Sequence, residues 1–251
     1  MRMLIVGAGT MGEWFGTLAS EWVSVEITDI DHTRAKAVAD SIGVSARQQP
    51  IDSAVDIVVT AVPIPATVPV IEEYGQLANS AIIDVSGTMA EPIEAMRSVG
   101  PACELLCLHP LFSPDNAPGN IPMVVEHDGR IAEQLTELLE AAGNTCFQTT
   151  ATEHDAAMRT VQSKAHSAIL AYALSAEPVD DKFQTPISSQ LNDLASSILS
   201  GESRVYADIQ SYFSGRESSA GSADILAQAD YREFQELFEA MALEWNTDET
   251  D

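Results

Sequence analysis

The sequence predicts an α/β fold with a doubly wound parallel sheet, followed by an all-helical part. Three observations predict this class. Short apolar runs alternate with helical patterns over residues 1–150, helical patterns alone fill residues 151–251, and a glycine-rich turn joins the first strand to the first helix. We therefore expect two domains, residues 1–150 and residues 151–251.

The glycine-rich turn is the strongest local signal. Residues 3–6 form an apolar run, three glycines follow, and a helical period then begins. Gly7 permits a tight turn, Gly9 lets a pyrophosphate approach the backbone, and Gly12 lets the helix pack close to the strand. The helix start also points N–H groups at the phosphates. The pattern predicts a Rossmann-type dinucleotide site. Its predicted contact residues are Gly7, Gly9, Thr10, Met11 and Gly12.

The second expected strand, residues 23–29, predicts which dinucleotide binds. It ends at Asp29, close to the spacing of about 20 residues at which a carboxylate binds the adenosine ribose. A carboxylate there repels a 2′-phosphate, the next residue is Ile30 rather than an arginine, and Asp31 adds negative charge. The sequence therefore favours NAD over NADP.

The other elements of the first domain follow the same alternation. We expect strands at residues 56–62, 80–85, 103–108, 122–126 and 145–148, and helices at 33–42 and 131–142. The carboxyl ends of parallel strands line the ligand crevice of such a sheet. Val62 and Pro63, at the end of the third strand, are therefore predicted to lie against the cofactor, although a plain strand end has the same pattern.

The second domain is expected to be helical throughout. Helical patterns cover residues 152–174, 188–199, 203–213 and 223–245, with a Gly/Ser-rich linker at 214–222 and an acidic tail at 246–251. The apolar stripes of these helices are expected to pack against a second copy of the chain, giving a homodimer.

Composition excludes several classes of partner. The formal net charge is −26, from 38 acidic and 12 basic residues spread along 251 positions, so nucleic acid and anionic membranes are not expected partners. The acidity is typical of a surface hydrated in concentrated salt, as in halophilic archaea; the alternative is an ordinary acidic cytosolic protein.

The apolar stretch 57–71 contains three prolines and is too short to span a membrane. With no signal-peptide pattern, we expect a soluble cytoplasmic protein. The three cysteines lack metal-ligand spacing, and no metal is expected.

His109 is the sharpest chemical signal. It directly follows the expected strand 103–108 and precedes Pro110, at the strand end where a substrate would meet a nicotinamide. The alternative is a structural His-Pro corner.

A second cluster, His154-Asp155 and the pair Gln162 and His166, follows at the start of the helical part. Together with the glycine fingerprint and His109-Pro110-Leu111-Phe112, these residues resemble the prephenate dehydrogenase family. Pro186-Ile187 and the segment 206–209 are also similar to that family's helical domain. The resemblance runs from residue 2 to about residue 210.

The resemblance implies an NAD-dependent oxidative decarboxylation of prephenate to 4-hydroxyphenylpyruvate, the precursor of tyrosine. Neutral His109 would accept the substrate hydroxyl's proton. Gln162 and His166 would line the substrate pocket, although His166 could equally be a core histidine. His154 and Asp155 could simply order the domain junction.

Two positions depart from the family pattern. Gly87 stands where the family has a serine, so Ser86 is predicted as the catalytic hydroxyl, with Thr88 as an alternative. Ser197 stands where the family often has an arginine for a substrate carboxylate. Lys164 is the predicted replacement, with Arg159 and Arg204 as alternatives, and each could instead form a surface ion pair.

Three rival functions stay open at this level. An arogenate dehydrogenase is the nearest, because the missing arginine weakens recognition of the pyruvyl carboxylate of prephenate. Another Rossmann-type dehydrogenase could act on a different small acid. A sensor that binds NAD without turnover belongs to a different class, and it would not need an imidazole at the hydride site.

Overall fold

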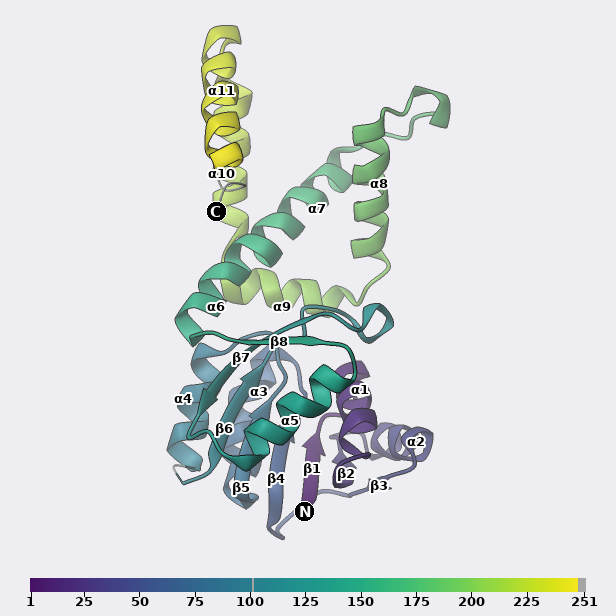
Figure 1. Cartoon of the computed structure of the whole chain (residues 1–251). Coiled ribbons are helices and arrows are strands. Elements are labelled where there is room, and N and C mark those ends of the chain that lie inside the picture. Colours follow the sequence, from purple (N-terminus) through teal and green to yellow (C-terminus); the bar gives the residue numbers. More distant parts are fainter. Residues whose placement is uncertain (101, 248–251) are drawn as a thin grey trace. The chain divides into compact units, whose positions relative to one another are not determined.

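The computed structural model describes residues 1–100 and 102–247 (Figure 1). The chain divides into two compact units, the first from Met1 to Ala157 and the second beginning at Met158. The division falls near the end of helix α6 (Ala151–Met158).

The first unit is built on one eight-stranded sheet with the strand order β3-β2-β1-β4-β5-β6-β7-β8. All seven expected strands form, and a short β3 is added at the edge. Their bounds are β1 (Arg2–Val6), β2 (Ser24–Thr28), β3 (Ser45–Ala46), β4 (Val55–Thr60), β5 (Ala78–Asp84), β6 (Glu104–Leu108), β7 (Asn120–Glu126) and β8 (Thr145–Gln148). The expected fold class is thus confirmed with one correction. β7 runs antiparallel to β6, so the sheet is mixed rather than wholly parallel.

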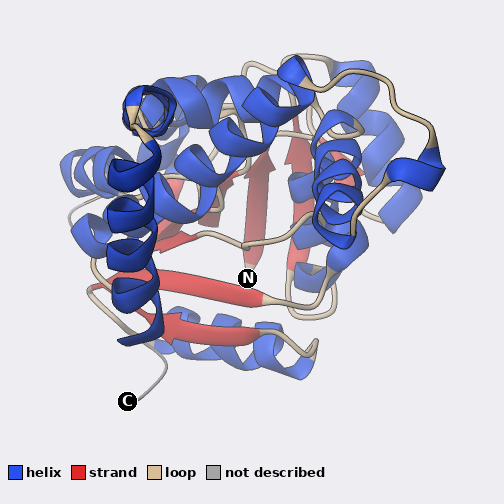
Figure 2. Cartoon of the chain, turned by 90° about the horizontal axis from the view of Figure 1, so that it is seen from above, coloured by secondary structure: helices blue, strands red, loops and turns tan. Residues whose placement is uncertain are grey.

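Helices cover both faces of this sheet (Figure 2). One face carries α1 (Thr10–Ala19), α2 (His32–Ile42) and α5 (Arg130–Ala141), while α3 (Ile64–Tyr74) and α4 (Ala90–Val99) pack together on the other. The sequence did not predict α3 or α4. The run that includes α3 is apolar on all sides and holds Pro65 and Pro69, which obscures a helical period. Pro65 lies in the first turn, where its missing N–H leaves no bond unmade.

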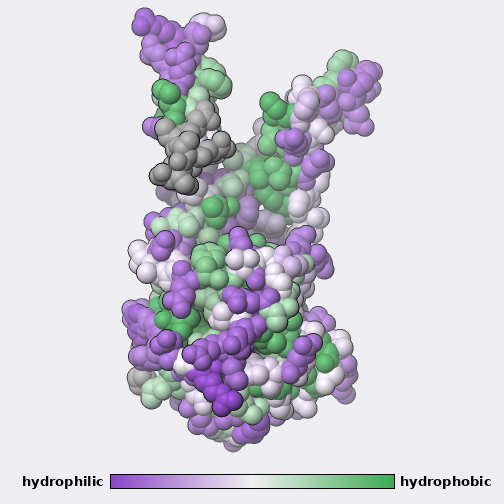
Figure 3. Space-filling model, in the orientation of Figure 1, coloured by the Kyte–Doolittle hydropathy of each residue, from purple (hydrophilic) through white to green (hydrophobic). Residues whose placement is uncertain are grey.

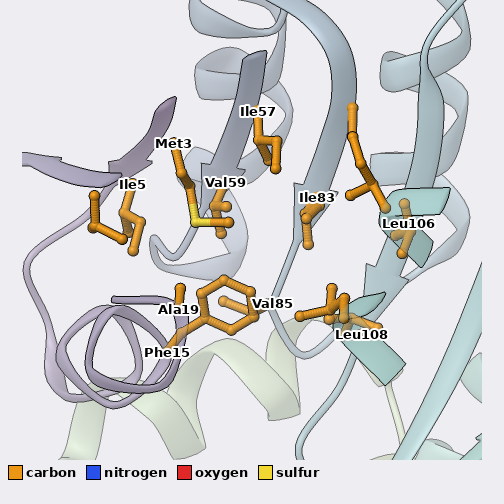
Figure 4. Close-up of a cluster of buried hydrophobic side chains, with 14 of the residues drawn as sticks. Met3, Ile5, Phe15, Ala19, Ile57, Val59, Ile83, Val85, Leu106 and Leu108 are labelled. Carbon is orange, nitrogen blue, oxygen red and sulfur yellow. The ribbon is translucent and has the colours of Figure 1, made fainter. Parts of the chain in front are cut away.

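The largest core cluster fixes α1 against the sheet. Figure 4 shows Phe15 and Ala19 of α1 beside Met3, Ile5 and Val59 of the central strands, all nearly or fully buried. Burying a side chain of this size contributes about 1.5–3 kcal/mol. The packing sets the start of α1, and therefore the glycine-rich turn, directly over the end of β1.

The carboxyl edge of the sheet collects the segments of interest. β2, β1, β4, β5 and β6 are mutually parallel, so the loops that follow them all leave at one edge. The chain turns from β2 on one side of β1 to β4 on the other, which is the switch point where such sheets bind ligands.

The second unit contains helices and no strand within its described residues. They are the π-helical turn η3 (Arg159–Lys164), α7 (Ala165–Ser175), α8 (Pro186–Leu199), α9 (Ser203–Phe213), α10 (Arg216–Gln228) and α11 (Tyr231–Thr247), with a short 3-10 turn η4 (Asp181–Phe183). α7 and α8 pack as a hairpin, and the Tyr172 hydroxyl donates to Asn192 Oδ1 at 2.8 Å.

Three sequence predictions for this unit need correction. The helix expected at 152–174 is interrupted by η3, and the helix expected at 223–245 is two helices separated at residues 229–230. The linker expected at 214–222 is mostly α10. Of the expected acidic tail, residues 246–247 belong to α11, and residues 248–251 lie outside the described part of the chain. No helix in the described residues combines the length and apolarity that a membrane span requires.

Candidate active site at the carboxyl edge of the sheet

The three fingerprint glycines have three different structural roles. Gly7 has φ +114°, and a Cβ on it would lie 2.2 Å from the Ala61 carbonyl oxygen. A Cβ on Gly12 would lie 2.0 Å from the Gly7 carbonyl oxygen. A Cβ on Gly9, in contrast, would meet nothing within 4 Å. Gly7 and Gly12 are therefore required by the protein itself, whereas the space over Gly9 suits a ligand that approaches the backbone.

The start of α1 completes this cradle. Gly9 is the N-cap residue, so no side chain caps the first turn, and the helix begins with Thr10 and Met11. Uncapped N–H groups and the positive end of the helix dipole favour a bound anion. Val62 borders the same turn, with its Cγ1 3.1 Å from a Cβ built on Gly7, and Pro63 follows as the N-cap of α3. The residues present thus fit the pyrophosphate of a dinucleotide.

Asp29 lies at the neighbouring strand end, one residue beyond β2. Its Oδ2 accepts the Ala8 N–H and its Oδ1 accepts the Asp31 N–H, each at 2.8 Å. The carboxylate is therefore held beside the glycine-rich turn, in the place where a ribose would follow the pyrophosphate. Ile30 is 94% exposed next to it and offers an apolar surface.

His109 leaves the end of β6 at the same edge and is 8% exposed. Its backbone N–H donates to the Pro122 carbonyl oxygen, which ties the residue to β7. Its Nδ1 lies 2.9 Å from Nε2 of His154, and the two rings meet edge to face with centroids 5.1 Å apart. Burial, and then the neighbouring His154, lower the pKa of His109 to about 3. The imidazole is therefore neutral near pH 7.

His154 and Asp155 lie on α6, and Asp155 contacts the ring nitrogen of His154 that faces away from His109. His154 Nδ1 lies 2.8 Å from Asp155 Oδ1, and the His154 side chain is fully buried. The two oxygens of Asp155 accept the N–H groups of Met89 and Ala90, each at 3.2 Å, at the start of α4. Sequence reasoning gave His154 and Asp155 a role in ordering the domain junction. The structure places them in a line of hydrogen-bonding groups that ends at His109, and the ordering role stays a prediction.

The loop between β5 and α4 borders His109 on another side. A Cβ on Gly87 would stand 3.6 Å from His109 Nε2. The Ser86 hydroxyl donates to Asp84 Oδ2 at 2.5 Å, so it is committed to that carboxylate. The catalytic role expected for Ser86 stays a prediction.

Asp84 is a functional candidate that the sequence analysis did not single out. It is fully buried at the end of β5 and accepts the hydroxyls of Thr60 and Ser86 and the Ser86 N–H. Burial raises its pKa to about 6, against the lowering effect of those hydrogen bonds. The available signal was an acidic residue at the end of an otherwise apolar strand. Asp84 and Asp155 hold the two ends of the loop that borders His109.

The predicted substrate residues lie in the second unit. Gln162 and Lys164 are in η3, and His166 is in the first turn of α7 with its ring 5.1 Å from that of Tyr206. Burial lowers the pKa of His166. Their approach to His109 stays a prediction.

The candidate cations differ in their surroundings. Lys164 is exposed, whereas Arg204 forms ion pairs with Glu202 and Asp208. Within the described residues, no three His, Cys, Asp or Glu side chains gather as a metal site.

Comparison with known proteins gives the site its context. Residues 17–120, which include Asp29, Asp84 and His109, match the family model of the prephenate dehydrogenase nucleotide-binding domain. The nucleotide-binding part of the chain is therefore similar to that domain of the prephenate dehydrogenases.

Two curated proteins are similar to this chain over more than the nucleotide-binding domain. The T-protein of Haemophilus influenzae is 30% identical over 221 residues, covering 83% of this chain and 55% of that protein. A probable arogenate/prephenate dehydrogenase of Methanocaldococcus jannaschii is 26% identical over 228 residues, covering 83% of this chain and 51% of that protein. The chain thus spans about half the length of the curated relatives it matches.

Solved structures support the fold. A prephenate dehydrogenase of A. aeolicus, in complex with hydroxyphenyl propionate and NAD⁺, aligns with a TM-score of 0.69 at 13% identity, covering 98% of both chains. An arogenate dehydrogenase of Synechocystis aligns with a TM-score of 0.65 at 15% identity, covering 98% of this chain and 99% of that one. At these identities the likeness concerns the fold alone.

Proposed function

We propose that the protein catalyses the NAD-dependent oxidative decarboxylation of prephenate to 4-hydroxyphenylpyruvate, a step towards tyrosine. The observation that carries the proposal is a neutral, buried His109 at the carboxyl edge of the sheet that also holds the glycine-rich turn. A site that only bound a nucleotide would not need an imidazole there. The match of residues 17–120 to the nucleotide-binding domain model of the prephenate dehydrogenases supports the same reaction class.

Each part of the first unit has a role in this proposal. NAD, when bound, supplies the acceptor for the hydride from the substrate carbon that carries the hydroxyl. The Gly9 backbone and the start of α1 hold the pyrophosphate, and Asp29 orients the ribose. His109 Nε2 accepts the hydroxyl proton as the carbonyl forms, and loss of CO₂ makes the ring aromatic. Ser86 is proposed to act only through the loop that carries Gly87, because its hydroxyl is bound to Asp84.

Arogenate is the second candidate substrate. Arogenate carries an amino group beside the side-chain carboxylate, and it depends less on a dedicated cation than the pyruvyl group of prephenate does. Ser197 occupies the place of the family's arginine, which favours this alternative. For prephenate, Lys164 is the proposed partner of that carboxylate, with Gln162 and His166 lining the pocket, because an unpaired carboxylate is costly to desolvate.

NAD is proposed rather than NADP. The Ala8 and Asp31 N–H groups fix Asp29 beside the glycine-rich turn, which supports a ribose contact by this carboxylate. A 2′-phosphate close to this carboxylate would be repelled by its like charge.

The second unit is proposed to form a homodimer. Large apolar side chains on its helices are strongly exposed, and Figure 3 shows hydrophobic surface on these helices. They include Leu174, Phe183, Ile187, Leu199, Tyr231 and Leu243. Monomeric proteins rarely leave this much apolar surface open to water, and a second copy of the chain would cover it. Light scattering after gel filtration tests this, and a monomer at micromolar concentration would contradict it.

A substrate panel tests the proposed reaction. Prephenate and arogenate are each supplied with NAD or NADP in molar salt, which suits a chain of net charge −26, and NADH absorbance is followed. Turnover of prephenate with NAD is expected. Faster turnover of arogenate than of prephenate would make arogenate the substrate. NAD binding without turnover of any candidate acid would favour a nucleotide sensor.

A further inference from the structure

We propose that Asp155 and His154 act as positioning residues that fix the tautomer of His109. In this arrangement the His109 proton resides on Nδ1, and Nε2 is the atom that accepts a proton. The hydrogen-bond inference stands on the geometry of the first unit alone. Its catalytic consequence rests on the proposed dehydrogenase function.

Asp155 determines which groups donate and which accept in this series of hydrogen bonds. Both of its oxygens accept backbone N–H groups, from Met89 and Ala90, at the positive end of the ten-residue helix α4. Two such donors and a helix dipole favour the carboxylate form, which can only accept. The 2.8 Å contact between Asp155 Oδ1 and His154 Nδ1 therefore places a proton on His154 Nδ1.

The tautomer of His154 determines the tautomer of His109. A neutral imidazole with its proton on Nδ1 has an acceptor at Nε2. That atom lies 2.9 Å from His109 Nδ1, so His109 must be the donor and carry its own proton on Nδ1. The His154 side chain is fully buried, so water cannot replace either contact.

The result at His109 is a ring whose Nε2 bears a lone pair. Burial and His154 keep this ring neutral, with the pKa at about 3. Nε2 also faces the loop after β5, since a Cβ built on Gly87 would stand 3.6 Å from it. When a substrate hydroxyl gives its proton to Nε2, the O–H bond breaks and an N–H bond forms. The positive charge that develops on His109 is then stabilised through Nδ1 by His154 and, behind it, Asp155.

One rival arrangement has the opposite consequence. If His154 carried two protons, its Nε2 would donate to His109 Nδ1. His109 would then hold its proton on Nε2 and could not accept one there. The two arrangements differ at both rings, so a measurement of ring protonation separates them.

Nitrogen NMR of the full-length protein, with ¹⁵N in its five histidine rings, makes this measurement. Each ring is assigned by replacing one histidine at a time with glutamine. We expect His109 and His154 each to show a protonated Nδ1 and an unprotonated Nε2 at pH 7. A protonated Nε2 on His109, or two protonated nitrogens on His154, would overturn the proposal. This spectrum needs no variant at Asp155 and no substrate.

Asp155→Asn supplies the kinetic test. An amide can turn its NH₂ towards His154 Nδ1, so that His154 carries its proton on Nε2 instead. His154 Nε2 then donates to His109 Nδ1, and the His109 proton moves to Nε2. We expect kcat to fall roughly 10²–10⁴-fold, the NAD dissociation constant to stay within about threefold, and the His109 proton to move to Nε2 in the spectrum. An unchanged kcat with an unchanged His109 spectrum would overturn the proposal.

Glu153→Gln is the matched control. It makes the same carboxylate-to-amide change two positions away, at an exposed residue whose Oε2 accepts the Thr149 hydroxyl. We expect wild-type kcat and an unchanged His109 spectrum in this variant. If the wild-type protein turns over neither prephenate nor arogenate, the proposed function fails, while the spectrum still decides the tautomer.

Discussion

Thr60 donates its hydroxyl to Asp84 at 2.5 Å, across the neighbouring strands β4 and β5 and inside the buried edge of the sheet. Asp84 also accepts the hydroxyl and the N–H of Ser86, so this carboxyl group anchors the loop that leads to Gly87 and α4. A fully buried acid in this position links the protonation of one group to the shape of the loop beside His109.

Asp84 should make stability depend on pH in a defined window. Its pKa is about 6 in the folded protein and near 4 in an unfolded chain, so between these values the folded state holds a proton that the unfolded state releases. Stability from this group is full below about pH 4 and is lost as the pH rises through about 6. The loss is on the order of 3 kcal/mol.

Denaturant unfolding of wild type and Asp84→Asn between pH 4 and pH 7 isolates this effect. Asparagine mimics the neutral acid and does not titrate. The stability of wild type relative to the variant should therefore decline as the pH rises. A difference that stays constant across the window would show that Asp84 does not titrate there.

Gly9 and Gly12 should respond in opposite ways to the same added methyl group. In Gly12→Ala the new Cβ meets the Gly7 carbonyl oxygen, so we expect a loss of stability on the order of 1–3 kcal/mol. In Gly9→Ala the new Cβ enters open space, so the melting temperature should hold while NAD affinity falls by about tenfold or more, or about 1.4 kcal/mol. Thermal melts and NAD titrations of both variants test this. Unimpaired NAD binding by Gly9→Ala would show that the cofactor does not bind at this turn.

Asp29→Asn and Asp31→Asn together separate ribose recognition from general charge. Each variant removes one negative charge near the end of β2, but Asp31 caps α2 by accepting from Thr33 and Arg34, a role that asparagine also fills. We expect Asp29→Asn to weaken NAD by about tenfold, or about 1.4 kcal/mol, and to reduce the preference over NADP. Asp31→Asn should leave NAD affinity nearly unchanged. Equal effects in both variants would argue against a ribose contact by Asp29.

The sequence predicted the first unit well because its signals are local. The turn after β1 needs glycine for reasons that act within a few residues, and apolar runs mark the strands. The direction of β7 has no such signal, since an antiparallel strand and a parallel one can share the same apolar pattern. α3 was missed because its apolar residues surround the helix and its prolines resemble those of a loop.

The second unit shows where composition misleads. Residues 214–222 are rich in glycine and serine, yet most of them form α10. A Cβ on Gly215 would lie 2.5 Å from Ser163 Oγ, so this glycine serves a close approach between distant parts of the chain rather than flexibility. Such a contact is invisible in the local pattern.

The candidate site was predicted in part. His109 was singled out from its place after a strand, but its contact with His154, 45 residues away in sequence, depends on how α6 packs against the end of the sheet. The same holds for Asp155, whose partners Met89 and Ala90 lie at a helix that the sequence did not predict. Asp84 was hidden because a buried acid looks like a strand end until its neighbours are known.

His109→Asn tests the central claim most directly, by NADH formation at saturating prephenate and NAD, with NAD affinity measured in parallel. His127→Asn is the control, because that histidine lies at the other edge of the sheet, with its Nδ1 3.2 Å from the Cys103 carbonyl oxygen. The account predicts a loss of turnover of roughly 10²–10⁴-fold in His109→Asn with NAD affinity nearly intact, and wild-type behaviour in the control. Full turnover by His109→Asn would contradict it.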